Sequence, residues 1–293
     1  VARQSGAYAA LLLDVEDFAL AMRLSNEAME IVGDRPDVKI TAATFGVVVG
    51  RVDLLRSVGD PMSTLRAAEA LLARCEASGN ADFTAAAQHA LARAARTTGD
   101  RARAAGLLER VYAHAVNWSD PLGQWLATLD RAAIALDQSE FDVARRWIDR
   151  VMPQRAAVDD AVLRARLDIA DARVAARQGE AGRARLAFQR ASALVANTSE
   201  TWLAANLREA EADVLVAEGK RDQAATVFRE AIALKVEAER QFQRRAISAQ
   251  ASLHRLSERE FREKQLEQEA KLRASELDAA EQRVVNQRLL VLL

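Results

Sequence analysis

The chain of 293 residues is poor in cysteine, proline and aromatic side chains, and its charges nearly cancel. Cys75 is the only cysteine, which excludes an internal disulfide and a cysteine metal cluster. With 41 basic residues against 42 acidic ones, no overall field favours nucleic acid, and we expect no nucleic-acid partner. Aromatic residues make up 5% of the chain and alanine is frequent, a composition typical of helices with no signature of strands.

Patterns that carry metals, phosphate loops or catalysis are also missing. The three histidines are His89, His114 and His254, and no two of them lie three or four residues apart, so no zinc motif is present. The glycines stand singly, which leaves no glycine-rich phosphate loop. We therefore expect no metal, no cofactor and no enzyme activity in this chain. A hydrolase hidden in the serine and histidine spacing is the weakest alternative.

A turn signal recurs every 40 residues, at Gly59, Gly99, Ser139, Gly179 and Gly219. Glycine after an apolar periodic run is typical of a helix C-terminus, because it enters the left-handed conformation without a steric penalty. Mostly small residues recur seven positions before and five after each turn, where two helices would cross closely. They are Val52, Ala92, Ala132, Ala172 and Ala212 before the turn, and Thr64, Ala104, Ala144, Ala184 and Ala224 after it. A period of this length predicts stacked helical hairpins, an all-α solenoid.

The repeated pattern resembles the tetratricopeptide repeat, with a small residue, a Gly-Asp turn, an alanine, a bulky residue and another alanine, as at Ala191 and Ala231. The resemblance covers roughly residues 5–235. It departs from the family in its period of 40 rather than about 34 residues, and in lacking the early tryptophan and tyrosine and most closing prolines. It implies an α–α superhelix over residues 1–235, in which the first helix of each hairpin lines a concave face.

The concave face predicted from this frame is rich in arginine, with acidic residues in the last repeat. Arginine offers paired donors to carboxylates and phosphates, so the face would suit a peptide that carries a carboxylate, a protein partner or a small anion. The candidate ligand-binding residues are Arg56, His89, Arg93, Arg96, Arg166, Arg173, Glu209 and Asp213. The alternative is a solvated charged face. We expect the four tryptophans to pack between hairpins, although one of them could instead line a ligand pocket.

No glycine or proline follows Gly219, so the remaining 74 residues contain nothing that breaks a helix on composition grounds. We expect residues 236–293 to form a long charged helix beyond the solenoid. Apolar residues recur in it every seven positions, which indicates a weak seam for a homodimer. The seam residues include Leu256, Leu277 and Val284. The alternatives are a solvated helix that folds back on the solenoid, and a break into a further hairpin.

The chain ends in an aliphatic run at residues 289–293, which looks like the first turn of a membrane span. An ordinary apolar helix end is the alternative. The segment Phe261–Glu267, after Arg244-Arg245-Ala246 and Leu253, is similar to one in bacterial membrane-anchored signalling proteins. In those proteins, tetratricopeptide repeats lead through a long charged helix and one span to a cytoplasmic output domain. The output domain is often a diguanylate cyclase and less often a histidine kinase.

This second resemblance implies a sensor and protein-interaction module, which relays a signal through its C-terminal helix to an output domain outside this chain. It places the solenoid in the periplasm, as a domain of an inner-membrane protein whose span lies beyond Leu293. Since the chain begins at Val1 rather than methionine, we expect it to be part of a longer protein. The alternative is a soluble cytoplasmic scaffold or regulator whose tetratricopeptide repeats bind peptides.

Overall fold

All regular structure is helical in the part of the chain that the computed structural model describes, which is residues 18–32, 40–57, 59–196, 198 and 200–292. The helices are α2 (Phe18–Val32), α3 (Ala42–Ser57), α4 (Pro61–Ser78), α5 (Ala81–Thr97), α6 (Arg101–Asn117), α7 (Pro121–Asp137), α8 (Phe141–Val151), the 3₁₀ helix η1 (Met152–Ala157), α9 (Ala161–Arg177), α10 (Ala181–Val195), α11 (Thr201–Ala217) and α12 (Arg221–Leu292). The predicted all-α solenoid followed by a long C-terminal helix is confirmed. Residues 1–17 and 33–39 of the predicted solenoid lie outside the described residues.

Each hairpin turns at the residue that the 40-residue period predicts. The turn glycines, with φ between 75° and 89°, are Gly59, Gly99, Gly179 and Gly219. Ser139 takes the same left-handed conformation with φ 59°, at a steric cost because it carries a Cβ. After Gly99, the backbone N–H of Asp100 donates to the carbonyl of Ala95 at 2.9 Å. This bond satisfies a carbonyl at the helix end and closes the turn.

Small side chains lie where the two helices of a hairpin cross. Ala92 of α5 and Ala104 of α6 are buried, as are Ala172 of α9 and Ala184 of α10. A methyl group at these positions lets the two backbones approach, whereas a larger side chain would overpack the crossing. The corresponding buried residues of the other hairpins are Val52, Thr64, Ala132, Ala144, Ala212 and Ala224. The predicted close crossings are therefore formed.

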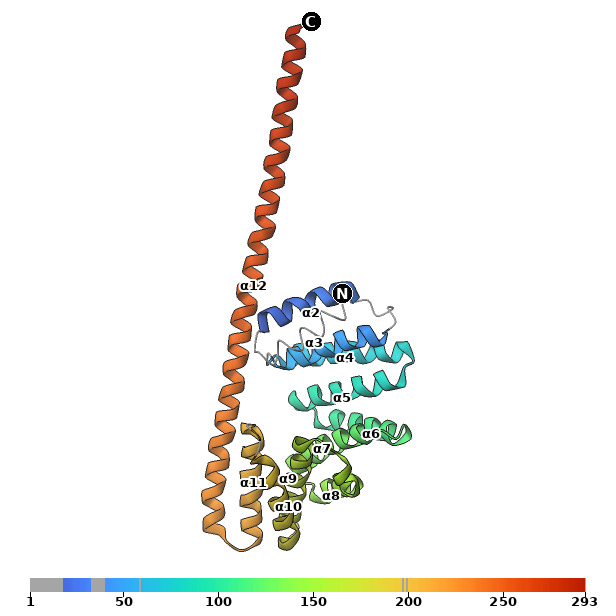
Figure 1. The fold of residues 1–293 in the computed structure, drawn as a ribbon, viewed down its shortest axis with the longest axis vertical. Coiled ribbons are helices and arrows are strands. Elements are labelled where there is room, and N and C mark those ends of the chain that lie inside the picture. Colours follow the sequence, from blue (N-terminus) through green and yellow to red (C-terminus); the bar gives the residue numbers. More distant parts are fainter. Residues whose placement is uncertain (1–17, 33–39, 58, 197, 199, 293) are drawn as a thin grey trace.

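The hairpins stack into a curved array, and α12 runs along one side of it (Figure 1). α12 begins as the second helix of the last hairpin, where Ala224 and Ala231 are buried, and continues without a break to Leu292. It contacts α11 and also α2, the first helix that the structure describes, and then projects beyond the stack (Figure 1). The long helix thus joins the two ends of the array.

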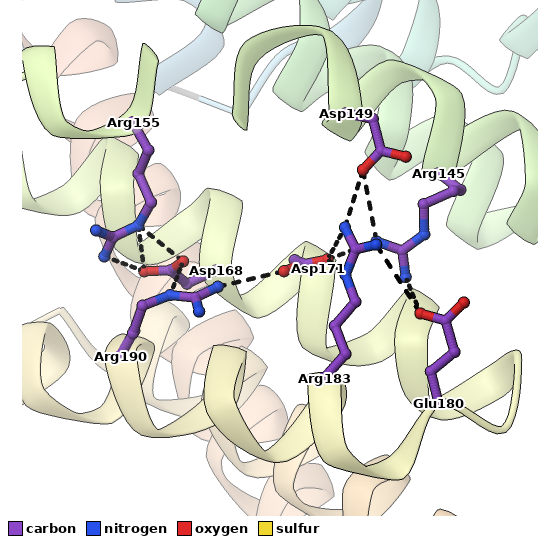
Figure 2. A network of polar contacts seen from close by, with 8 residues as sticks. All are labelled: Arg145, Asp149, Arg155, Asp168, Asp171, Glu180, Arg183 and Arg190. Atoms are coloured by element: carbon purple, nitrogen blue, oxygen red, sulfur yellow. Dashed lines mark hydrogen bonds and ion pairs between the residues drawn. The ribbon is translucent and has the colours of Figure 1, made fainter. Parts of the chain in front are cut away.

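Two buried aspartates of α9, Asp168 and Asp171, fix that helix to its neighbours (Figure 2). Their partners come from α8, η1 and α10, and are Arg145, Arg155, Arg183 and Arg190. Without such partners the two carboxylates would be too costly to bury. By helical periodicity, Asp168 and Asp171 lie on the opposite side of α9 from Arg166 and Arg173. The network therefore sets which face of α9 turns toward the groove described next.

Candidate ligand-binding groove

A cavity of about 290 Å³ lies between the first helices of successive hairpins. Its walls come from α5, α7, α9 and α11, and α12 contributes one residue. The lining includes four of the residues predicted from the repeat frame, which are Arg96, Arg166, Arg173 and Glu209. The first helices of these hairpins therefore share one groove, and the structure brings half of the predicted site residues together in it.

The floor of the groove is apolar. Leu129 of α7, Ile169 of α9 and Leu203 of α11 are buried and line the cavity. Leu129 and Ile169 are 40 residues apart, so the repeat places them at equivalent positions on neighbouring helices. Trp202 of α11 lines the same cavity and is 39% exposed, and its indole N–H donates to Glu200 at 2.7 Å. An apolar surface thus adjoins a large aromatic ring that solvent can reach.

Asp130 of α7 links three of the inner helices. Its carboxylate accepts a hydrogen bond from Arg166 Nη2 of α9 at 2.9 Å, and its Oδ2 lies 3.0 Å from His89 Nε2 of α5. Burial by itself would raise the pKa of Asp130. The hydrogen bond with His89 and the positive charge of Arg166 outweigh burial and hold that pKa well below its ordinary value. Arg166 therefore already has an ionised partner within the protein.

Arg173 of α9 likewise has acidic partners. Its Nη2 donates to Glu209 at 3.0 Å, and its Nε donates to Asp213 at 3.2 Å. Arg177 also lies 2.7 Å from Asp213, and Lys235 Nζ of α12 donates to Glu209 at 2.5 Å. Because residues 173 and 213 are one repeat apart, opposite charges at the same repeat position pair across neighbouring hairpins. This end of the groove is neutralised by the protein itself.

The other predicted arginines gather at the opposite end of the groove. Arg56 of α3, and Arg93 and Arg96 of α5, line a second cavity of about 230 Å³. Arg96 lines both cavities, so the two adjoin. Asp53 is the acidic partner here, at 3.4 Å from Arg56 Nη2 and 3.9 Å from Arg93 Nη1.

Other predicted site residues lie away from these two cavities. His89 lines a third cavity, of about 460 Å³, between α5, α6 and α7, and Asp213 is buried beside the groove without lining it. The seam residues Leu256, Leu277 and Val284 all lie on α12. Among them, Leu277 has a described side chain that is 65% exposed.

Three residues of the groove were missed by the sequence interpretation. Lys235 lies on the second helix of its hairpin, whereas the repeat frame assigns the concave face to first helices. Asn206 carries no charge and drew no attention among the arginines. Asp130 occupies a repeat position that holds glycine or alanine in the other copies, such as Ala90 and Ala170, so the frame indicated a packing position. A lone acid at such a position was the available signal.

Neither a metal site nor a membrane span is found in the part of the chain that the structure describes. No group of three or more His, Cys, Asp or Glu side chains there is placed to hold a metal ion. No helix there is both long enough and apolar enough to cross a membrane. α12 has the length, but residues 257–283 carry 14 charged side chains, which a bilayer core does not accept. The prediction of a periplasmic domain of an inner-membrane protein is thus contradicted.

Known proteins resemble this chain in structure rather than in sequence. No protein-family model matches it, and no curated protein does either. A Rap protein complexed with competence and sporulation factor matches with a TM-score of 0.60 and 15% identity, over 82% of this chain and 65% of that one. A kinesin light chain of Podosopora anserina with nearly identical TPR-like repeats matches with a TM-score of 0.50 and 18% identity, over 66% and 95% of the two chains. The fold is tetratricopeptide-like.

A third structure supports the same tetratricopeptide-like fold. BtubC (BKLC) from P. vanneervenii matches with a TM-score of 0.53 and 15% identity, over 82% of this chain and 92% of that one. This chain spans less than two thirds of the Rap chain. At such low identities, these likenesses show the fold alone, and the function has to be argued from the groove.

Proposed function

We propose that this chain is a peptide-binding module, a scaffold or regulator that holds an extended segment of a partner protein in the groove of α5, α7, α9 and α11. The observation that carries the proposal is the cavity of about 290 Å³, with its buried apolar floor and its polar rim. The role is one of binding rather than catalysis. This function is favoured over that of a sensor in a membrane-anchored transducer, whose relay to a diguanylate cyclase or histidine kinase has no support in the groove.

The lining suits a peptide because it combines an apolar floor with a neutral polar side chain. An apolar side chain of the peptide would pack on Leu203 and Trp202. Asn206, one helical turn further along α11, lines the cavity, and its carboxamide has no hydrogen-bond partner among the described residues. A carboxamide both donates and accepts, so it can pair with the C=O and N–H groups of a peptide backbone.

The charged rim is preorganised for such a ligand. Arg166 and Arg173 are held in place by acidic partners from neighbouring hairpins, so they lose little side-chain freedom when a ligand binds. One of the similar folds, the Rap protein, was solved in complex with a factor, which fits a ligand-binding role for this architecture.

A displayed library of random peptides, selected against the whole chain, tests this function. The affinity of enriched peptides is then measured by fluorescence anisotropy with the unmodified chain and two variants. Ala133→Trp fills the cavity, because Ala133 lines it. Ala73→Trp is the matched control, since Ala73 is an exposed residue of α4 that lines none of the three cavities.

We expect Ala133→Trp to weaken peptide binding by about tenfold or more, because a blocked anchor pocket removes the burial of one apolar side chain. Ala73→Trp should leave the affinity unchanged. Circular dichroism of both variants checks that the helices are intact. A library that yields no enriched peptide, or peptides that bind Ala133→Trp as tightly as the unmodified chain, would overturn the proposal.

We also propose that α12 pairs with α12 of a second copy. The helix projects beyond the stack (Figure 1) and exposes large apolar side chains there, including Leu266 and Leu277. These two leucines are 11 residues apart and share one face of the helix, whereas Leu272 points to another side. The seven-residue recurrence of apolar residues continues along the same face, which favours a two-stranded coiled coil.

A further inference from the structure

Three arginines surround the second cavity without enough acid to neutralise them. Arg56, Arg93 and Arg96 line this space of about 230 Å³ beside the turn between α3 and α4. Their acidic neighbour Asp53 contacts Arg56 and Arg93 at the long distances given above, and Arg96 forms no ion pair with any described residue. Three positive charges therefore face one negative charge, an excess of two.

Other acids nearby are committed elsewhere. Asp60, the next acidic residue along the chain, accepts the backbone N–H of Ser63 at 2.9 Å and caps α4. The hydrogen bonds with Ser63 lower the pKa of Asp60, so its charge is used at the helix N-terminus, and it does not line the cavity. Asp130 is shared between His89 and Arg166. The excess charge of the arginine cavity is left without a local counterpart in the described chain.

Arg56 carries the cost of this arrangement. Burial, and the positive charge of Arg93, lower the pKa of Arg56. Its Nε is buried and has no hydrogen-bond partner. A desolvated N–H without an acceptor, next to a like charge, is unfavourable in the empty cavity. An anion placed between the arginines would relieve both terms at once.

Hydroxyl groups do not supply the missing acceptors or donors. Thr64 and Thr97 line the cavity, but each hydroxyl donates to a backbone carbonyl of its own helix or turn, Thr64 to Asp60 at 2.6 Å and Thr97 to Arg93 at 3.0 Å. Recognition in this cavity therefore depends on the guanidinium groups. Guanidinium forks match the oxygens of phosphates and carboxylates by paired hydrogen bonds.

We propose that the arginine cavity, formed by Arg56, Arg93 and Arg96, binds a phosphate monoester. The group carries about −1.5 to −2 charge at neutral pH, which matches the local excess of two, whereas a carboxylate would neutralise half of it. The source is either a free phosphorylated small molecule or a phosphorylated residue of the peptide in the adjoining groove. The second source rests on the proposed peptide-binding function, since Arg96 lines both cavities.

O-phospho-L-serine and inorganic phosphate are the probes, and L-glutamate is the carboxylate comparison. Binding to the full chain is measured by isothermal titration calorimetry at near-physiological salt. Arg96→Gln is the informative variant, because Arg96 has no acidic partner whose charge the change would leave unpaired. Arg101→Gln is the matched control, on an exposed arginine of α6 that does not line the cavity.

We expect both phosphate probes to bind more tightly than glutamate, and Arg96→Gln to weaken them by about tenfold through the loss of one charge-assisted contact. Arg101→Gln should bind as the unmodified chain does. Absence of phosphate binding, or equal weakening by Arg96→Gln and Arg101→Gln, would overturn the proposal, the latter because it indicates a diffuse surface charge.

A second pair of measurements separates this site from the groove. Ala133→Trp should leave the binding of free O-phospho-L-serine unchanged while it blocks groove peptides. A groove peptide synthesised with and without phosphoserine at successive positions then identifies the source of the phosphate. Tighter binding at one position, lost in Arg96→Gln, assigns it to the peptide, and no gain at any position assigns it to a free small molecule. Peptide binding without any phosphate binding would defeat this inference alone.

Discussion

Replacing Asp168 by alanine tests whether the ion network of Figure 2 holds α9 in place. Asp168 is fully buried and accepts hydrogen bonds from Arg155 Nε and Arg190 Nε, each at 2.9 Å. After the change, Arg190 keeps a contact with Asp171 at 3.3 Å. Arg155 keeps no acidic partner in the described part of the chain. The variant therefore leaves one guanidinium unpaired and another only weakly paired.

The exposure of the two arginines sets the magnitude. Breaking a buried ion pair costs about 3–5 kcal/mol, because the remaining charge stays buried without a partner. The side chains of Arg155 and Arg190 are 24% and 39% exposed, so water can reach them and the lower value applies. We expect Asp168→Ala to lower the free energy of unfolding by about 3 kcal/mol. Asp149→Ala is the control, because Asp149 belongs to the same network but is 50% exposed, and such a pair is worth about 1 kcal/mol or less.

Urea denaturation followed by circular dichroism measures the two losses. A stack of hairpins can unfold in parts, so hydrogen exchange of the α9 amides should be recorded as well, since it gives the free energy of local opening. The expected result is a large loss in Asp168→Ala and a small one in Asp149→Ala. Equal losses would refute the view that burial, rather than the number of ion pairs, makes this network important.

Three further predictions concern the groove, the turns and α12. Because the folded protein depresses the pKa of Asp130, its stabilising contribution is complete above the ordinary carboxyl pKa of about 4 and is lost as the pH falls below it; the urea midpoint of Asp130→Asn should therefore fall less in acid than that of the unmodified chain, and parallel curves would contradict this. Ser139→Gly should raise the free energy of unfolding by up to about 1 kcal/mol, because φ at Ser139 is 59°, whereas Gly99→Ala should lower it in the same denaturation assay. If α12 pairs with a second copy, Leu277→Glu should yield a monomer in sedimentation while Leu272→Glu leaves the dimer intact, and a monomeric unmodified chain would exclude the pairing.

The fold was predictable because its signals are local. Gly99, Gly179 and Gly219 end their helices through the conformation that glycine allows, and the neighbouring alanines mark the crossings. Even Ser139 was located from the period alone. The uninterrupted α12 also followed from composition, but its contact with α2 depends on the curvature of the whole stack, which no single segment encodes.

The candidate site was only partly predictable, because its chemistry depends on partners from other repeats. Arg166 and Arg173 fit the concave face in sequence, yet acids from neighbouring hairpins neutralise them. Asp130 interrupts a row of small residues, and its role appears only when α5, α7 and α9 are placed side by side. The membrane prediction was wrong for a related reason: it extended a short aliphatic ending and a charge pattern into a property that needs a long apolar helix.

Site-directed photo-crosslinking tests the peptide-binding groove most directly. A photoreactive amino acid replaces Asn206 in the groove or Ala73 on the outer face of α4, and each chain is irradiated with a peptide enriched from the library. A peptide held between the inner helices should crosslink at position 206 and not at position 73. Crosslinking at position 73 without any at position 206 would contradict the proposed function.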